Sequence, residues 1–154
     1  HADLFSREYH LTGHAHGAAY RFPYPDASFD FVISTSVFTH MLPPDVENYL
    51  GEIARVLRPG GRSLTTFFLL NPEAAALLDA GRSPLNLAHD HGAYRLLNER
   101  IPEAAIAHDE QTVREWLRAR SLRLREPIRY GRWCGREPST GYQDMLLVAK
   151  PKDD

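Results

Sequence analysis

The sequence predicts an α/β fold built on parallel strands. Two apolar segments, residues 29–35 and 63–70, have the β-branched and aromatic composition of strands that are buried on both faces. Between them, residues 44–57 carry apolar side chains at the spacing of one helix face. A strand–helix–strand unit of this kind places its two strands parallel, with a right-handed crossover. A further apolar segment, residues 143–150, adds a strand to the same sheet.

The composition is typical of one soluble domain. The chain has 154 residues, of which 43% are hydrophobic and 25% are charged, and its net charge is −2. No apolar run approaches the roughly 20 residues of a membrane-spanning helix, and the charge provides no field that attracts nucleic acid. Cys134 is alone, so no intrachain disulfide forms. We therefore expect a single domain over residues 1–154 in the cytoplasm, with no nucleic-acid or membrane partner.

The first helix is predicted to begin near Pro44 and to end at Pro59-Gly60-Gly61, which also turns the chain into the next strand. Its predicted core side chains share one face and are Val46, Tyr49, Leu50, Ile53, Ala54 and Leu57.

Asn71 followed by Pro72 has the pattern of an N-cap and first helical position, and it predicts a short helix that Gly81 ends. Residues 82–108 show no regular pattern. We expect residues 71–108 to form an insertion after the second strand, and long insertions of this kind often act as lids in α/β enzymes.

Three more elements complete the chain. An amphipathic helix is predicted to start near Asp109 and to bury Val113, Trp116 and Leu117. Residues 122–130 alternate apolar and charged side chains, which favours a strand at a sheet edge with one face in water. Residues 143–150 are apolar throughout, so their strand is expected between other strands.

This order of elements resembles the C-terminal part of the class I S-adenosylmethionine-dependent methyltransferases. The segments that carry the resemblance are "FPYPDASFDFVISTSVFTHM", "LGEIARVLRPGGRSLTTFF", "YQDMLLVAKP" and "ADL" at residues 2–4. The resemblance implies a Rossmann-like half-sheet made of the family's strands 4-5-7-6, with helices on its faces. It also implies methyl transfer from S-adenosylmethionine to a small-molecule acceptor.

The family's glycine-rich cofactor turn has no counterpart here, since none of the ten glycines form a G-x-G pattern. The resemblance implies that about two βα units are missing before residue 1, on the order of 60 residues. We therefore expect this chain to be an incomplete portion of the enzyme, inactive alone. The strand at 29–35 would then be an open edge that pairs with the missing N-terminal segment or, in a homodimer, with a second copy.

The resemblance also assigns cofactor contacts. Asp3 would accept a hydrogen bond from the adenine amino group, and Leu4 would cover the ring. Ser34, Thr35 and Ser36 lie at the end of the strand at 29–35, on the side where α/β sheets bind ligands. We expect these hydroxyl residues to face the cofactor, Thr35 and Ser36 above all. Alternatively, they only cap the loop through local hydrogen bonds.

Candidate acceptor contacts lie in two places. His40 follows the same strand end and is a candidate catalytic base or substrate contact; the alternative is a packing role. In the insertion, His89, Asp90, His91 and Tyr94 are candidates for binding the acceptor. Polar loop residues of this kind are otherwise simply solvated.

Two H-x-H pairs, His14/His16 and His89/His91, are the only basis for a metal-hydrolase hypothesis. Zinc sites need three or four ligands, and these pairs lack a nearby Cys or Glu at helical spacing, so we expect no metal.

Arginines are concentrated near the C-terminal end. Seven of them lie within residues 118–136. They are consistent with an anionic acceptor or with nucleic acid, but the stronger interpretation is the wet face of an edge strand, where charge discourages strand addition.

A second function class also remains open. A half-sheet of this kind is consistent with a non-catalytic α/β module that is held together by self- or partner-pairing of the strand at 29–35.

Overall fold

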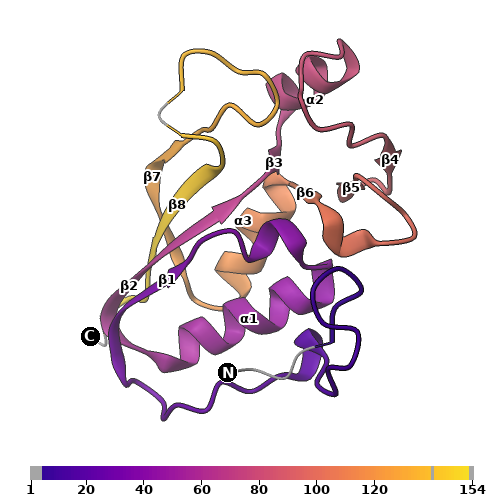
Figure 1. Cartoon of the computed structure of the whole chain (residues 1–154). Helices are drawn as coiled ribbons and strands as arrows, with labels where there is room; N and C mark the ends of the chain where they lie inside the picture. Colours follow the sequence, from indigo (N-terminus) through magenta and orange to yellow (C-terminus); the bar gives the residue numbers. More distant parts are fainter. Residues whose placement is uncertain (1–4, 140, 153–154) are drawn as a thin grey trace.

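The computed structural model describes residues 5–139 and 141–152. Its larger sheet has four strands in the order β1-β2-β8-β7 (Figure 1). β1 and β2 are parallel, and the other neighbours are antiparallel. The strands are β1 (Phe29–Ser34), β2 (Leu57–Phe67), β7 (Arg123–Arg129) and β8 (Asp144–Ala149). The predicted Rossmann-like half-sheet is confirmed.

Helix α1 (Pro43–Val56) makes the crossover between β1 and β2. It ends earlier than predicted, because β2 begins at Leu57 and runs through the Pro-Gly-Gly segment. The pairing of β1 with β2 is irregular here, since Phe29 lies opposite Leu57 but Phe31 lies opposite Arg62. Gly60 has a φ of +80°, a conformation that glycine adopts without steric cost, so a bulge takes up the extra residues.

The two remaining helices begin as predicted. Helix α2 (Pro72–Asp79) is capped by Asn71, whose side chain accepts a 2.9 Å hydrogen bond from the backbone N–H three residues on. It is followed by Gly81 at a φ of +68°. Helix α3 (Glu110–Ala119) is capped in the same way by Asp109, over 3.1 Å.

A second sheet occupies the insertion, in the order β3-β6-β5-β4. Its strands are β3 (Leu69–Leu70), β4 (His89–Asp90), β5 (Tyr94–Leu96) and β6 (Ile106–Asp109). The expectation that residues 82–108 are irregular was therefore wrong. These strands have two to four residues, too few to show a period of two. Only Phe68 separates β2 from β3, so the predicted strand at 63–70 passes from one sheet into the other.

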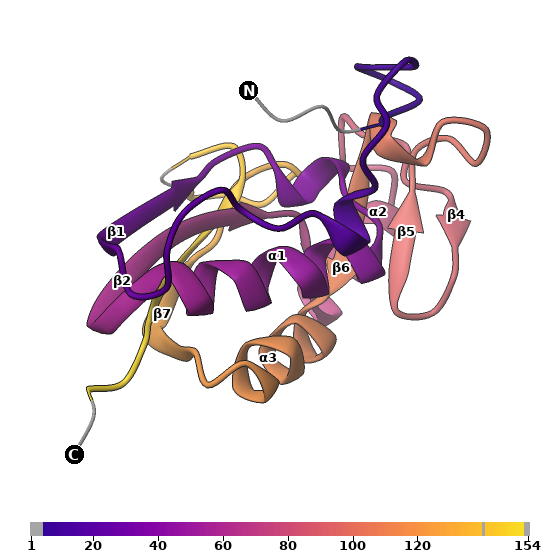
Figure 2. The same cartoon turned by 90° about the horizontal axis from the view of Figure 1, so that it is seen from below.

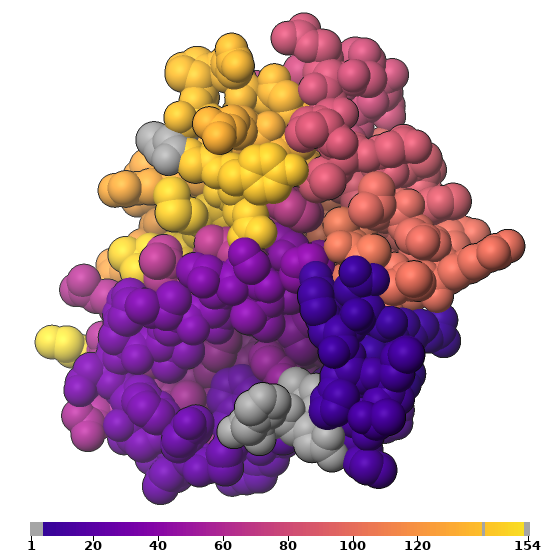
Figure 3. Space-filling view, in the orientation of Figure 1, coloured from indigo at the N-terminus to yellow at the C-terminus, as the bar shows by residue number. Residues whose placement is uncertain are grey.

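Three short 3₁₀ turns complete the fold: η1 (Gly17–Ala19), η2 (Phe38–His40) and η3 (Pro102–Ala104). In Figure 3 the N-terminal segment lies beside the surface formed by the region of η2 and α1.

The main core lies between the larger sheet and two helices on one face, α1 and α3 (Figure 2). All of the side chains predicted for the core face of α3 are buried, as are those of α1 except Ala54, which is partly buried. On β1, the side chains that face away from these helices stay exposed, with Phe31 at 47% and Ile33 at 63%. In the part of the chain that the structure describes, β1 pairs on one side only.

The C-terminal strands follow the sequence pattern. β8 lies between β2 and β7, and β7 forms the far edge. On β7 the exposed side chains include Arg123, Arg125 and Arg129, in agreement with the predicted edge strand that has one face in water. Among the described residues, no helix has the length and apolar character needed to cross a membrane.

Candidate functional site

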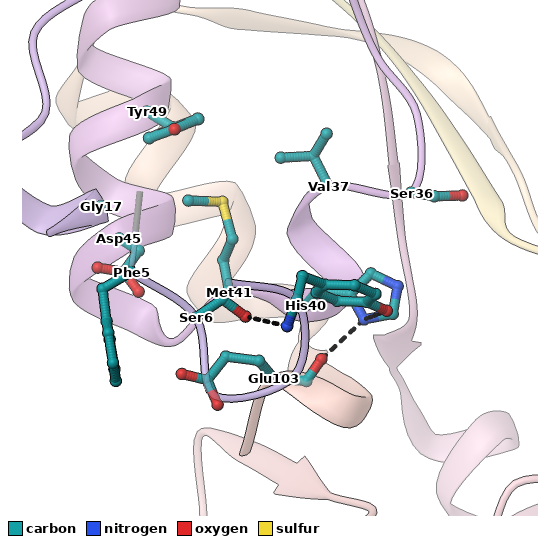
Figure 4. Close-up of a pocket in the computed structure, with 11 residues that line it drawn as sticks. Phe5, Ser6, Gly17, Ser36, Val37, His40, Met41, Asp45, Tyr49 and Glu103 are labelled. Atoms are coloured by element: carbon teal, nitrogen blue, oxygen red, sulfur yellow. Dashed lines mark hydrogen bonds between the residues drawn. The ribbon is translucent and has the colours of Figure 1, made fainter. Parts of the chain in front are cut away.

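A cavity of about 490 Å³ opens beyond the carboxyl end of β1 (Figure 4). Four segments form it: the N-terminal segment, η2 with the residues around it, the first half of α1, and η3. The aromatic part of the cavity wall consists of Phe5, Tyr9 and Tyr49, and the aliphatic part consists of Val37 and Met41. An apolar cavity with a few polar groups is the usual form of a small-molecule site.

His40 supplies the imidazole ring of this cavity. Its Nδ1 lies 2.8 Å from the carbonyl oxygen of Glu103, and Tyr9 Oη is 3.2 Å from the same nitrogen. Because a carbonyl oxygen only accepts, Nδ1 carries the proton of the neutral ring. Nε2 therefore keeps its lone pair and is the nitrogen that can take a proton from a ligand.

Two carboxylates, Asp45 and Glu103, also line the cavity. Burial raises the pKa of Asp45, although backbone hydrogen bonds from Ala18 and Leu42 oppose this. The Oε2 atom of Glu103 is buried and has no hydrogen-bond partner in the part of the chain that the structure describes. Neither lysine nor arginine is among the described residues that line the cavity. The site therefore suits a neutral or positively charged ligand better than an anion.

The predicted cofactor residues are found in different settings. Ser36 lines the cavity, is exposed, and has a φ of 54°, in the left-handed region. Its N–H donates to Thr66 Oγ1 over 2.9 Å. Ser34 is the last residue of β1, and Thr35 is exposed beside it. Asp3 and Leu4 lie outside the described residues, so their assignment stays a prediction.

The predicted acceptor contacts of the insertion lie in and between β4 and β5. His91 stacks on Tyr94, with ring centroids 4.9 Å apart and planes at 7°. Nitrogens of His89 and His91 lie 3.7 and 3.6 Å from Glu99. Among its described residues, the cavity beside His40 is not lined by His89, His91 or Tyr94. Their role stays a prediction.

No group of three or more His, Cys, Asp or Glu side chains is placed to hold a metal ion within residues 5–139 and 141–152.

Sequence reasoning missed several residues of this region, among them Glu103, Thr66 and Gln143. Glu103 comes from the insertion and is 63 residues from His40, which its carbonyl binds. Gln143 lies 107 residues from Ser36, which it contacts. No local pattern marks such residues, because only the fold brings them to the site.

The sequence comparisons find methyltransferases. A family model described as "Methyltransferase domain" matches residues 3–65. The chain is 32% identical over 159 residues to the 27-O-demethylrifamycin SV methyltransferase of Amycolatopsis mediterranei, covering 88% of this chain and 57% of that relative. The chain therefore spans little more than half of that protein's length.

Solved structures show the same fold at lower identity. A SAM-dependent methyltransferase from Methanosarcina mazei superimposes with a TM-score of 0.58 at 16% identity, covering 90% of this chain and 66% of that chain. The 1,6-didemethyltoxoflavin-N1-methyltransferase of Burkholderia thailandensis gives 0.51 at 18% identity, covering 90% and 49%. Its structure holds 1,6-didemethyltoxoflavin and S-adenosylhomocysteine.

Proposed function

Because this chain belongs to the class I S-adenosylmethionine-dependent methyltransferase family, we propose that it forms the acceptor-binding part of an enzyme that methylates a small molecule. The observation that carries the proposal is the cavity at the carboxyl end of β1, which His40 lines while its Nδ1 is bonded to the Glu103 carbonyl. In α/β folds, ligands bind outside the carboxyl ends of the strands.

The residues at the end of β1 fit part of the cofactor. Ser34, Thr35 and Ser36 offer hydroxyl groups suited to the polar groups of a nucleoside or amino acid. Asp3 and Leu4 would hold the adenine, as the family resemblance implies. The chain contributes no G-x-G turn, so we infer that this chain by itself binds S-adenosylmethionine weakly and is inactive.

When bound, S-adenosylmethionine supplies a methyl group activated by its positive sulfur, and the sulfur–carbon bond breaks as the acceptor–carbon bond forms. The chain's own residues place the acceptor and exclude water from it. His40 Nε2 would accept the proton that an acceptor hydroxyl or amine loses. The hydrogen bond from Nδ1 to the Glu103 carbonyl would stabilise the resulting imidazolium and hold its orientation.

The acceptor is proposed to be a small molecule with an apolar, aromatic body and no negative charge. The aromatic wall of Phe5, Tyr9 and Tyr49 supports the apolar body. The carboxylates of Asp45 and Glu103 support the absence of an anionic group, because like charges in a partly buried site repel. The names of the Amycolatopsis and Burkholderia proteins likewise refer to small molecules. The His89, His91 and Tyr94 cluster remains a candidate second contact.

Calorimetric titration with S-adenosylmethionine tests this proposal. It compares the 154-residue chain with the full gene product. We expect saturable binding by the full gene product and at least tenfold weaker binding by the 154-residue chain. No binding by the full gene product would refute the methyltransferase proposal. Equal, tight binding by both would refute only the view that this chain is incomplete.

A second candidate function is a non-catalytic module that pairs through β1. The exposed Phe31 and Ile33 and the unpaired side of β1 in the described chain favour it. In the enzyme, the same edge would pair with a strand of the N-terminal part or with a second copy. Absence of cofactor binding together with stable self-association would favour the module.

A further inference from the structure

Three residues at the end of β1 form a closed ring of hydrogen bonds, to which Ser36 contributes both its backbone N–H and its hydroxyl. The N–H of Ser36 donates to Thr66 Oγ1 over 2.9 Å. The Thr66 hydroxyl donates to Gln143 Oε1 over 2.6 Å, and Gln143 Nε2 donates to Ser36 Oγ over 3.1 Å. Each donor in this ring faces an acceptor, so the arrangement is internally satisfied.

The ring determines what the Ser36 hydroxyl can do. Because an amide nitrogen only donates, Ser36 Oγ acts as the acceptor toward Gln143 Nε2. Gln143 Oε1 already accepts the shorter bond from Thr66, and its 3.3 Å contact with Ser36 Oγ is the weaker one. The Ser36 hydroxyl thus donates only over this long contact with Gln143 Oε1, and an acceptor atom in the cavity, which Ser36 lines, would offer its proton a shorter bond.

Gln143 is itself held firmly. The next residue, Asp144, is fully buried at the start of β8. Its carboxylate accepts 2.7 Å hydrogen bonds from the N–H groups of Leu69 and Gly131 and from the indole of Trp133. These bonds fix the backbone from which Gln143 reaches across to β1.

The ring also supports an unfavourable backbone conformation. A serine at a φ of 54° is disfavoured by roughly 1 kcal/mol or more. The bond from Ser36 N–H to Thr66 helps to offset this cost, so the turn is held where the cavity begins.

We propose that Gln143 is a positioning residue of the methyl-transfer site: by donating to Ser36 Oγ, it directs the Ser36 hydroxyl toward an oxygen or nitrogen of bound S-adenosylmethionine. Gln143 does not line the cavity among the described residues, so it acts through Ser36. The inference rests on the proposed function and assigns a role to a residue that neither the resemblance nor the strand pattern indicates.

The test measures the dissociation constant of S-adenosylmethionine for the full gene product. The variants are Gln143→Leu, Gln143→Glu, Ser36→Ala, and Ser36→Ala combined with Gln143→Leu. The matched control is Gln111→Glu, the same chemical change at an exposed residue of α3. Circular dichroism verifies that each variant is folded.

We expect Gln143→Leu and Ser36→Ala each to weaken binding by about tenfold, the effect of one lost hydrogen bond. In the Ser36→Ala background, Gln143→Leu should have no further effect. Gln143→Glu should weaken binding at pH 8, where the carboxylate captures the Ser36 proton. At pH 4 the loss should shrink, because more than half of a Glu side chain with an ordinary pKa is then protonated and again donates. A merely structural role would not produce this pH dependence.

Two outcomes would overturn the inference alone. In one, the wild type binds and both Gln143 variants bind equally well. In the other, Gln143→Leu weakens binding to the same degree with and without the Ser36 hydroxyl. Failure of the wild type to bind would instead overturn the proposed function, and the inference with it.

Discussion

The buried imidazole of His108 lies 3.2 Å, through its Nε2, from the carbonyl oxygen of Phe38. This hydrogen bond joins β6 of the small sheet to η2, the turn that carries His40. His108 also packs edge-on against Phe67 and Trp116. It therefore links the insertion, the core and the candidate site.

The first prediction is that His108 makes stability depend on pH. Burial lowers its pKa from the usual 6.5 to about 4, so the unfolded chain binds the proton more tightly. The contribution of His108 to stability is complete above pH 6.5 and is lost as the pH falls toward 4, by about 3 kcal/mol. Urea unfolding between pH 4 and 7 measures this. His108→Gln should lack this contribution, and identical pH profiles for the variant and the wild type would contradict it.

Asp144 should make stability depend on pH in the direction opposite to that of His108. Burial raises its pKa from 3.8 to about 6, although three N–H donors oppose the shift. Between pH 4 and 6 the folded state keeps a proton that the unfolded state loses, so stability falls as the pH rises. The contributions of the two groups nearly cancel in the wild type. His108→Gln should therefore become less stable from pH 4 to 6.

Asp144→Asn should reveal the His108 dependence. An amide cannot accept at both oxygen positions, so its NH₂ group must face an N–H donor. We expect a loss of about 2 kcal/mol at pH 6 and a larger loss at pH 4, because the stability of this variant increases from pH 4 to 6 while that of the wild type changes little. Urea unfolding over the same pH range measures both effects. Stability of the variant that does not change between pH 4 and 6 would contradict the assignment of this pH dependence to His108.

Two glycines should respond oppositely to alanine. A Cβ at Gly131 would overlap the backbone carbonyl oxygen of Tyr142, and backbone atoms can move away only at a large energetic cost. Gly131→Ala should cost about 3 kcal/mol. Gly51 lies within α1, where the nearest atom to a new Cβ is 4.0 Å away. Gly51→Ala should stabilise by about 0.5–1 kcal/mol. Thermal unfolding gives both values, and the same sign for both would exclude this explanation.

Proton acceptance by His40 can be separated from its packing role. His40→Asn can keep a donor near the Glu103 carbonyl but lacks an equivalent of Nε2. If His40 is the base, His40→Asn and His40→Ala should both reduce kcat of the full gene product by about a hundredfold, with little change in KM for S-adenosylmethionine. Steady-state kinetics decides, and near-wild-type turnover by His40→Asn would leave His40 only a structural role.

The open side of β1 should promote self-association of the 154-residue chain. Replacing Ile33, which is 63% exposed, by lysine places a charge on that strand and should shift the chain toward monomer. Leu11→Lys is the matched control, since Leu11 is 71% exposed and lies outside β1. Light scattering after size-exclusion chromatography measures the mass. A wild-type monomer at all concentrations would rule out pairing through this edge.

The larger sheet could be predicted because its strands are either continuously apolar or, in β7, regularly alternating, and because the helices that pack on it have clear sequence signals. Asn71 and Asp109 cap their helices as the sequence indicated. The small sheet could not be predicted from the sequence, because strands as short as His89–Asp90 have no measurable periodicity. Its pairing is fixed by tertiary contacts, such as that of His108 with Phe38.

The candidate site was predictable only in part. Ser36 and His40 follow a strand end, which is a positional signal, and both line the cavity. Glu103 and Gln143 became visible only in the folded chain, because each depends on a partner that is remote in sequence. The sequence also indicated acceptor contacts at His89, His91 and Tyr94, but these residues do not line that cavity in the described part of the chain.

The continuity of β2 and β3 has a mechanical consequence. The two strands are separated by Phe68 alone, which is 4% exposed and packs on Trp133, and the next N–H is bonded to Asp144. At its other end the insertion is anchored through β6 and His108. A segment that is fixed at both ends cannot rotate as a rigid lid about a single hinge. We therefore expect any movement of the insertion that admits a ligand to be greatest around β4 and β5, which lie between the two anchored ends.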